Sequence, residues 1–199
     1  GRTVIKRTNI LRQKHLKNHF FGGVVEATYR HEAADLNLGA AANHYMGEHF
    51  GYVQDHLYNT VKDFDHEYYN NDGKKTTATV YAKANWRAIH LAQRKLTVYA
   101  DLQYRYVNYR IDGKNDDDDT QAVIHLNEDF HFFNPKAGIS WQRDYHHTYA
   151  SIAMSHREPE RNNFTDNGSY PAPKAEQVMD YELGYTFDGD IIRLGANLF

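Results

Sequence analysis

The chain has no cysteine among its 199 residues. This excludes a disulfide-stabilised scaffold and any zinc or iron–sulfur site with cysteine ligands inside this chain. The sequence also lacks long hydrophobic runs, and its mean hydropathy is −0.80. A membrane-spanning helix needs roughly 20 consecutive apolar residues. The longest apolar stretches here are a few residues, so the sequence predicts no transmembrane helix.

Neither sign of charge dominates the chain. Lys and Arg number 23 and Asp and Glu number 26, which gives a formal net charge of −3. This balance offers no general argument for nucleic acid or another polyanion as a partner. The opening Gly1-Arg2-Thr3 contains neither a starting methionine nor the apolar core of a signal peptide. We therefore expect that a leader was removed or that the chain begins within a longer protein.

Aromatic and histidine residues are abundant instead. The chain contains 16 Tyr, 10 Phe and 13 His, although its composition is hydrophilic overall. A soluble protein core of this size would need more Leu, Ile and Val. The aromatic residues must therefore have another use than filling a single compact core.

Apolar and polar residues alternate with a period of two along most of the chain, and this pattern predicts β-strands. Helix signals are nearly absent, since the best helix-forming stretch, 88–95, is too short to be stable alone. We predict an all-β fold with strands of about ten residues each. The eight predicted strands are 21–30, 35–43, 77–86, 96–106, 133–142, 149–157, 178–187 and 192–199.

The connections between these strands alternate between short and long. The short ones are 30–35, 87–95, 143–147 and 188–190, and the long ones are 46–75, 110–131 and 156–176. In an up-and-down antiparallel sheet every second connection lies at the same end. All short turns therefore share one end, which is typical of outer-membrane β-barrels.

Aromatic residues recur next to the short turns. The last apolar-face residues before these turns are Tyr29, Trp86, Trp141 and Phe187. Their spacing predicts an aromatic girdle at one lipid interface, because amphipathic rings favour the headgroup layer. At the other end, Tyr104, Tyr106 and Phe133 could form the second girdle.

A soluble β-sandwich or lipocalin-like barrel would also have one apolar strand face. In such a protein, however, Leu, Ile and Phe face inward and charges face outward. Here the apolar face is rich in Ala, and the other face carries both signs of charge, as the wet lumen of a barrel does. The pattern therefore favours a transmembrane β-barrel.

Four strings of the sequence are distinctive when taken together. They are 68–75, 132–138, 157–166 and 174–185. These strings resemble the barrel domain of TonB-dependent outer-membrane receptors, and the resemblance spans about residues 19–199. Its most specific part is Arg157-Glu158-Pro159 followed, after a long loop, by 174–185. Ala175 stands where the family usually has proline.

The resemblance implies a 22-stranded barrel in the outer membrane of a Gram-negative bacterium, with a plug domain inside it. We therefore expect residues 1–199 to be a partial β-barrel domain of about eight strands, without the plug and the remaining strands. The implied function is TonB-coupled uptake of a scarce ligand. A siderophore or other metal chelate is favoured, and haem and cobalamin stay open as ligand classes.

Two other functions are compatible with the strand pattern. The chain could form a small outer-membrane barrel with a structural or adhesive role, or a soluble β-protein that binds a ligand. No nucleophile triad, phosphate loop or H-E-x-x-H motif is present, so we expect no enzyme and no resident cofactor.

Four histidines in or beside the first long loop are candidate ligands for a metal or haem, because imidazole binds both. Their spacing matches no compact metal motif, so a hydrated loop is the competing interpretation. These histidines are His44, His49, His56 and His66.

Charged residues on the lumen face are candidates for contact with the plug. They are Glu26, Arg105, Lys136, Asp180 and Glu182. The expected partners are the lipid bilayer, lipopolysaccharide beside the basic stretch 2–17, the TonB complex through the plug, and a small-molecule ligand. Nucleic acid is not expected.

Overall fold

A computed structural model describes residues 9–56, 66–114, 123–165 and 172–199. These residues form eight β-strands and one short helix, α1 (Arg161–Thr165). No helix in these ranges is long and apolar enough to cross a membrane. The strands are β1 (Ile10–Arg30), β2 (Ala34–His56), β3 (His66–Leu91), β4 (Arg94–Lys114), β5 (Val123–Arg143), β6 (His146–Arg157), β7 (Glu176–Asp188) and β8 (Arg193–Leu198).

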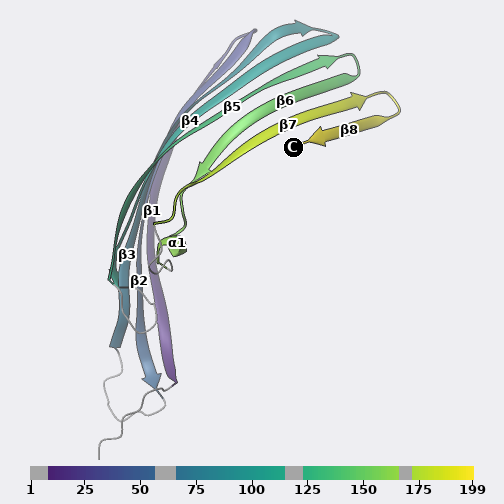
Figure 1. Cartoon of the computed structure of the whole chain (residues 1–199). Helices are drawn as coiled ribbons and strands as arrows, with labels where there is room; N and C mark the ends of the chain where they lie inside the picture. The colour runs from purple at the N-terminus through teal and green to yellow at the C-terminus, as the bar shows by residue number, and fades with distance from the viewer. Residues whose placement is uncertain (1–8, 57–65, 115–122, 166–171) are drawn as a thin grey trace, which may run out of the picture.

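All eight strands belong to one antiparallel sheet whose spatial order is the sequence order, β1 to β8 (Figure 1). The predicted all-β, up-and-down fold is confirmed. Across the described residues no ladder joins β1 to β8, so the sheet is open. A small closed barrel of eight strands would need that ladder, and the structure therefore does not favour the small-barrel hypothesis.

The register keeps apolar and charged side chains on opposite faces. Leu38, Ala82 and Leu102 are paired across β2, β3 and β4 and lie in one apolar row. In the next row, Lys83 is paired with Asp101, and their charged groups lie 3.6 Å apart. Because side chains alternate along a strand, each successive row points to the other face. The sheet thus has one apolar face and one charged face.

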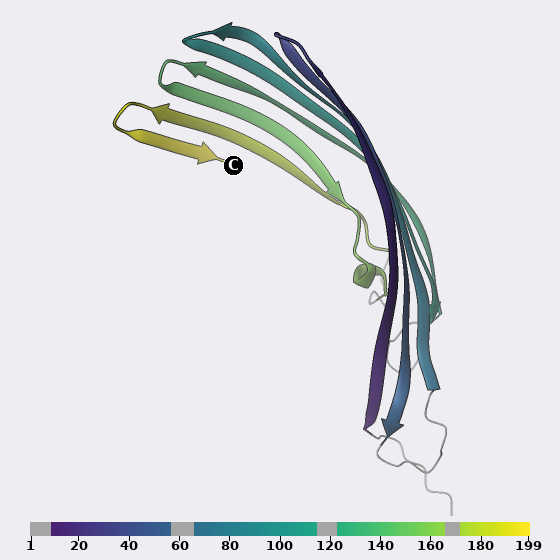
Figure 2. The same cartoon turned by 180° about the vertical axis from the view of Figure 1, so that it is seen from behind.

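The charged face is the concave one. The sheet is strongly curved, and α1 lies inside the curve in both views (Figures 1 and 2). In α1, the Phe164 ring lies 5.8 Å from that of Tyr109, and Arg161 donates a hydrogen bond to Asn71. Tyr109 and Asn71 share the face that carries the charged rows, so the apolar face is convex.

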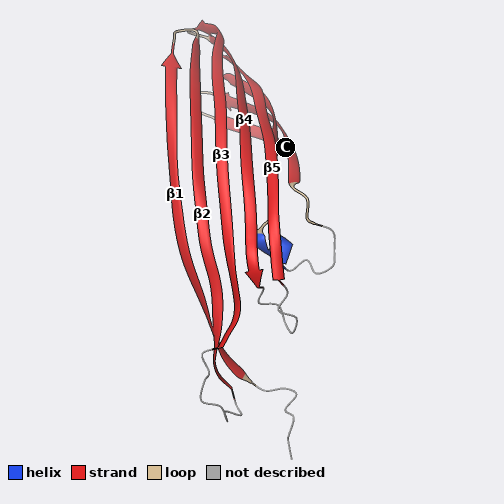
Figure 3. Ribbon diagram, turned by 90° about the vertical axis from the view of Figure 1, so that its left-hand side faces the viewer, coloured by secondary structure: helices blue, strands red, loops and turns tan. Residues whose placement is uncertain are grey.

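Seven of the eight strands are longer than the sequence pattern predicted, and β8 is shorter. The segment 46–75 was expected to be a long loop, but β2 continues to His56 and β3 begins at His66. Figure 3 shows these extended strands side by side. The prediction was wrong because the extensions mix polar and aromatic residues on both faces, so they carry no clear period-two signal although their backbones still pair.

Pro135 marks the point where the sheet divides. Pairing between β5 and β6 runs only from Lys136 to Arg143, whereas β4 and β5 pair along their whole length. Proline has no backbone N–H to donate to a ladder. Beyond Pro135, β6 continues to pair with β7 but leaves β5. This divergence leads the chain after Arg157 onto the concave face (Figure 1).

The four aromatic residues beside the short turns lie on the convex face in a regular stagger. Tyr29 shares its row with Ala84, and Trp86 is two residues further toward the turns. Trp141 is two residues beyond the row of Trp86, and Phe187 is two beyond that of Trp141. The aromatic position thus shifts by two residues from one hairpin to the next, or by one residue per strand. Closing a sheet into a barrel requires a stagger of this kind.

On the concave face, tyrosine rings lie flat over glycines of the neighbouring strand. A Cβ atom added to any of these glycines would come within 2.0–2.5 Å of the ring atoms. Glycine is therefore needed here for close approach rather than for a special backbone angle. The pairs are Gly39 with Tyr81, Gly138 with Tyr99, and Gly184 with Tyr149.

We expect Gly138→Ala to destabilise the folded sheet by about 1–3 kcal/mol, because the added methyl group displaces the Tyr99 ring. Gly23→Ala is the matched control, since a Cβ at Gly23 meets no atom within 4 Å. Thermal unfolding of the intact protein in detergent measures both. A double variant, Gly138→Ala with Tyr99→Ser, should recover part of the loss. Equal stability of the two single variants would contradict the packing role.

Candidate ligand-binding site

The segment 157–165, which includes α1, covers part of the concave face. Beneath it lie the most deeply buried side chains of β4, since Val107 and Ile111 are both 0% exposed. Asn71 is also buried, and it accepts a hydrogen bond from Arg161 Nη2 at 2.6 Å. Its own amide donates to the carbonyl oxygen of Lys114 at 3.0 Å. This local core holds the segment against β3 and β4.

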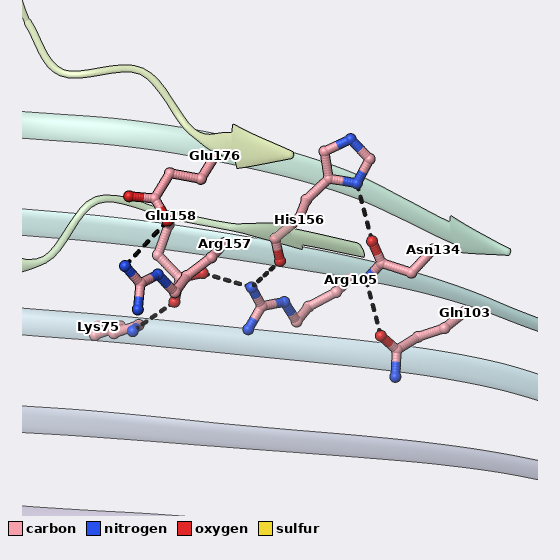
Figure 4. A network of polar contacts seen from close by, with 8 residues as sticks. All are labelled: Lys75, Gln103, Arg105, Asn134, His156, Arg157, Glu158 and Glu176. Carbon is pink, nitrogen blue, oxygen red and sulfur yellow. Dashed lines mark hydrogen bonds and ion pairs between the residues drawn. The ribbon is translucent and has the colours of Figure 1, made fainter. Parts of the chain in front are cut away.

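Glu158 is the buried charge that ties this segment to the sheet. Its side chain is only 8% exposed and forms ion pairs with two cationic side chains (Figure 4). Lys75 Nζ of β3 lies 2.7 Å from one carboxylate oxygen, and Arg105 Nη2 of β4 lies 2.5 Å from the other. A buried carboxylate needs such partners, because removing an unpaired charge from water is very costly.

The pKa of Glu158 reflects a balance of two effects. Burial raises the pKa, since it disfavours the charged form. The hydrogen bond from Lys75 and the positive charges of Lys75 and Arg105 lower it more, so the net pKa lies below the ordinary value. Glu158 is therefore ionised at neutral pH and holds both cations on the concave face.

A second set of contacts fixes the chain on either side of Glu158 (Figure 4). Arg157 pairs with Glu176 at 3.0 Å, which joins the end of β6 to the start of β7. The His156 ring shares a hydrogen bond with Asn134 at 2.9 Å and stacks on Phe132. The Arg-x-Pro string and the later Lys-x-Glu string of the sequence thus meet through an ion pair.

A pocket of ≈ 420 Å³ lies between this segment and the sheet. Its floor includes Tyr45, Lys75 and Tyr109, which are paired with one another across β2, β3 and β4. Its other wall includes residues 157–161 of the covering segment, and His49 of β2 also lines it. The volume falls within the usual range for small-molecule sites.

Besides Glu158, two side chains that line the pocket have shifted pKa values. Burial raises the pKa of Tyr109 to about 12, so its hydroxyl keeps its proton at neutral pH. Burial, and then the positive charge of Arg161, lower the pKa of His49. At neutral pH the imidazole of His49 is therefore mainly uncharged.

The structure does not gather the four candidate histidines. His49 lines the pocket on the concave face, whereas His44 lies on the convex face and shares a hydrogen bond with Thr76 at 2.8 Å. The side chains of His56 and His66 lie outside the described residues. In the part of the chain that is described, no group of three or more His, Asp or Glu side chains could hold a metal ion.

The five predicted lumen residues all lie on the concave face, but their contacts differ. Glu26 accepts a hydrogen bond from Tyr81 at 2.6 Å, Glu182 accepts one from Ser151 at 3.4 Å, and Arg105 binds Glu158. The remaining two, Lys136 and Asp180, are each paired in register with Ala153 of β6. Their contact with a plug stays a prediction.

Sequence reasoning missed Arg161, Tyr109 and Lys75 as pocket residues. They come from α1, β4 and β3, and only the path of the covering segment brings them together. In the sequence, the Arg157-Glu158-Pro159 string was the one signal for this site. It indicated the covering segment 157–165 but not the residues of β3 and β4 that the segment contacts.

Comparison with known proteins identifies the architecture. The chain matches the family described as "TonB dependent receptor-like, beta-barrel" over residues 4–199. Among solved structures it resembles one titled "Copper transporter OprC", with a TM-score of 0.67 and 17% sequence identity. The similarity covers 94% of this chain and 30% of that one, so the chain spans less than a third of the length of that structure. No curated protein sequence matches.

We expect Glu158→Gln to weaken the attachment of segment 157–165, because Lys75 and Arg105 lose their shared counter-charge. The loss should be about 1.5–3 kcal/mol, the range for hydrogen bonds to charged groups. Hydrogen exchange of this segment in the intact protein measures it. Glu160→Gln is the control, since the Glu160 side chain is 73% exposed and its Arg157 contact is 3.9 Å long. Equal protection in the two variants would argue against the role of Glu158.

The same carboxylate predicts a pH dependence. Because its folded-state pKa is lowered, its stabilising contribution is complete above the ordinary glutamate pKa of about 4.3 and is lost as pH falls through the lower folded value. Cleavage of segment 157–165 by pepsin should therefore rise below about pH 4 in the unmodified protein. In Glu158→Gln the cleavage should already be high at pH 5, and a parallel profile for both proteins would count against the assignment.

Proposed function

Because the chain belongs to the TonB-dependent receptor β-barrel family, we propose that it forms part of the transmembrane wall of an outer-membrane uptake receptor. The proposed receptor binds a scarce small molecule outside the cell and passes it inward with TonB-coupled energy. In this proposal the rest of the barrel and a plug domain belong to the same protein. The family consists of transport receptors, and we propose no enzymatic activity.

The separation of the two sheet faces is the observation that carries this proposal. On the convex face, large apolar side chains are widely exposed, for example Tyr29 at 63% and Trp86 at 56%. An extended apolar surface of this kind requires a non-aqueous partner. The concave face is charged and hydrogen-bonded, as expected for a wall around a wet lumen.

The dimensions of the convex face suit a bilayer. Placing the four staggered aromatic residues at one height tilts the strands by about 35°, since each strand advances one residue of about 3.4 Å over a spacing of about 4.8 Å. On β3, the apolar row containing Ala78 and Tyr106 lies about 27 Å from Trp86 along the strand, which corresponds to a height of about 22 Å along the membrane normal. Transmembrane barrels have a comparable tilt and an apolar band about 25 Å tall.

In this orientation the candidate pocket lies beyond the membrane-embedded band. Tyr109 is three residues past Tyr106, toward the long connections, which we assign to the outer side. The convex face next to the outer leaflet changes from apolar to charged at Lys74 and Arg110, which are paired in register. This level is where lipopolysaccharide headgroups would meet the wall.

The ligand class that we propose is a metal chelate, with a siderophore complex as the leading example. The structural neighbour is titled a copper transporter, which supports a metal-bearing ligand at the level of analogy only. Haem and cobalamin are the competing classes. Lys136 and Asp180 are the concave-face residues that we propose for plug contact.

Uptake measurements test the function directly. A strain lacking the gene should lose uptake of one compound in a panel of ferric siderophores, copper, haem and cobalamin. The same uptake should stop when the inner membrane is de-energised, because transport depends on TonB. Normal uptake of every compound by the deletion strain would contradict the proposed transport role.

Neighbouring residues on β6 test the membrane orientation. Ile152 lies on the convex face and Ser151 on the concave face. We expect Ile152→Arg to cost about 2–4 kcal/mol, the value for Arg at the bilayer midplane. Ser151→Arg should cost far less, since water reaches that face and Glu182 lies beside it. Folding yield into lipid bilayers measures both, and equal losses would contradict the face assignment.

A further inference from the structure

We infer that the pocket beneath segment 157–165 is an oxyanion-binding site, in which Arg161 holds a carboxylate or phosphate group of the transported ligand. Tyr109 and His49 supply further contacts. The inference rests on the proposed uptake function, and it assigns a chemical class of ligand and a set of residues to it.

The charge balance of the pocket singles out Arg161. The other cations that line it already have carboxylate partners, since Lys75 pairs with Glu158, and Arg157 pairs with Glu176 and Glu160. Among the described residues, Arg161 has no carboxylate within ion-pair distance, and its Nη2 donates a hydrogen bond to the neutral amide of Asn71. One positive charge in the pocket is therefore uncompensated.

Arg161 also has an unused donor. Its Nε atom is buried and makes no hydrogen bond to the residues that the structure describes. A buried N–H without a partner costs free energy, so such groups usually mark a missing acceptor. A guanidinium group offers donors only, and carboxylate and phosphate oxygens accept only, which makes them its natural partners.

The neighbouring side chains extend this donor set. The hydroxyl of Tyr109 keeps its proton, so it can donate a hydrogen bond within this pocket. Arg161, Tyr109 and His49 all line the same pocket. A ligand oxygen there could accept from Arg161 and from the Tyr109 hydroxyl at once.

The same charge makes a bare metal cation a poor occupant. Arg161 would repel it, and no group of three acidic or histidine ligands lies in the described residues. An anionic chelate avoids both problems, because the metal keeps its own ligands and the protein contacts the outer oxygens. The pocket of ≈ 420 Å³ suits a small organic anion or one arm of a larger chelate.

Binding to the purified intact receptor tests the inference. The anionic probes are ferric citrate and inorganic phosphate, and a neutral ferric trihydroxamate serves as the uncharged probe. We expect Arg161→Gln to weaken binding of an anionic probe roughly tenfold or more, and Arg161→Lys to weaken it less. The neutral probe should bind both variants as it binds the unmodified receptor. The probe whose binding affinity falls more in Arg161→Gln identifies whether the site prefers a carboxylate or a phosphate.

Lys74→Gln is the matched control, because it removes one charge from the opposite face of β3 next to Lys75. If Arg161→Gln does not fold, Tyr109→Phe replaces it, since this change removes the hydroxyl and keeps the ring that contacts Phe164. Unchanged affinity for both anionic probes in the folded variants overturns the inference. Failure of the unmodified receptor to bind either anion also overturns it, while uptake in the deletion strain decides the transport function separately.

Discussion

The fold depends on one constraint, which is that side chains alternate between two faces while paired strands keep those faces in step. A shift of one residue in any ladder would move a whole apolar row to the other side of the sheet. In the described residues the register shifts only near strand ends, at Leu11/Arg12, Gly51/Tyr52 and Arg87/Ile89, so the two faces stay separate along the rest of the sheet. Both the exposed convex aromatics and the ionic concave contacts follow from it, and so does the contrast between the two environments that the sheet separates.

The concave face shows how a buried charge can organise a non-repetitive segment. Glu158 accepts from two strands at once, so the covering segment is fixed relative to β3 and β4 rather than to its own neighbours in sequence. Such contacts contribute more to a defined geometry than to overall stability, because desolvation offsets much of the attraction. With Glu158 satisfied, the charge of Arg161 remains directed at the pocket.

Most of the wall could be predicted from the sequence. The strand order, the two faces and the aromatic positions follow from period-two alternation, which is a local signal. The extensions of β2 and β3 could not be predicted, because polar residues such as Glu48 and aromatic residues such as Phe50 alternate there without a consistent apolar face. The pocket could not be predicted either, since it depends on where the chain leaves β6, and that depends on the ladder that stops at Pro135.

The short β5–β6 ladder has a kinetic meaning. The four ladders that join β1 to β5 extend over nearly the full length of these strands. The β5–β6 ladder covers only Lys136 to Arg143 of β5. The free energy needed to separate two strands locally rises with the number of contacts between them, so the boundary with the fewest contacts opens first. The β5–β6 boundary is thus the weakest seam inside the sheet, since only the ladder of the edge strand β8, which pairs with Leu183 to Asp188, is shorter. It separates a block of five long strands from one of three short strands, and we expect these two blocks to open separately.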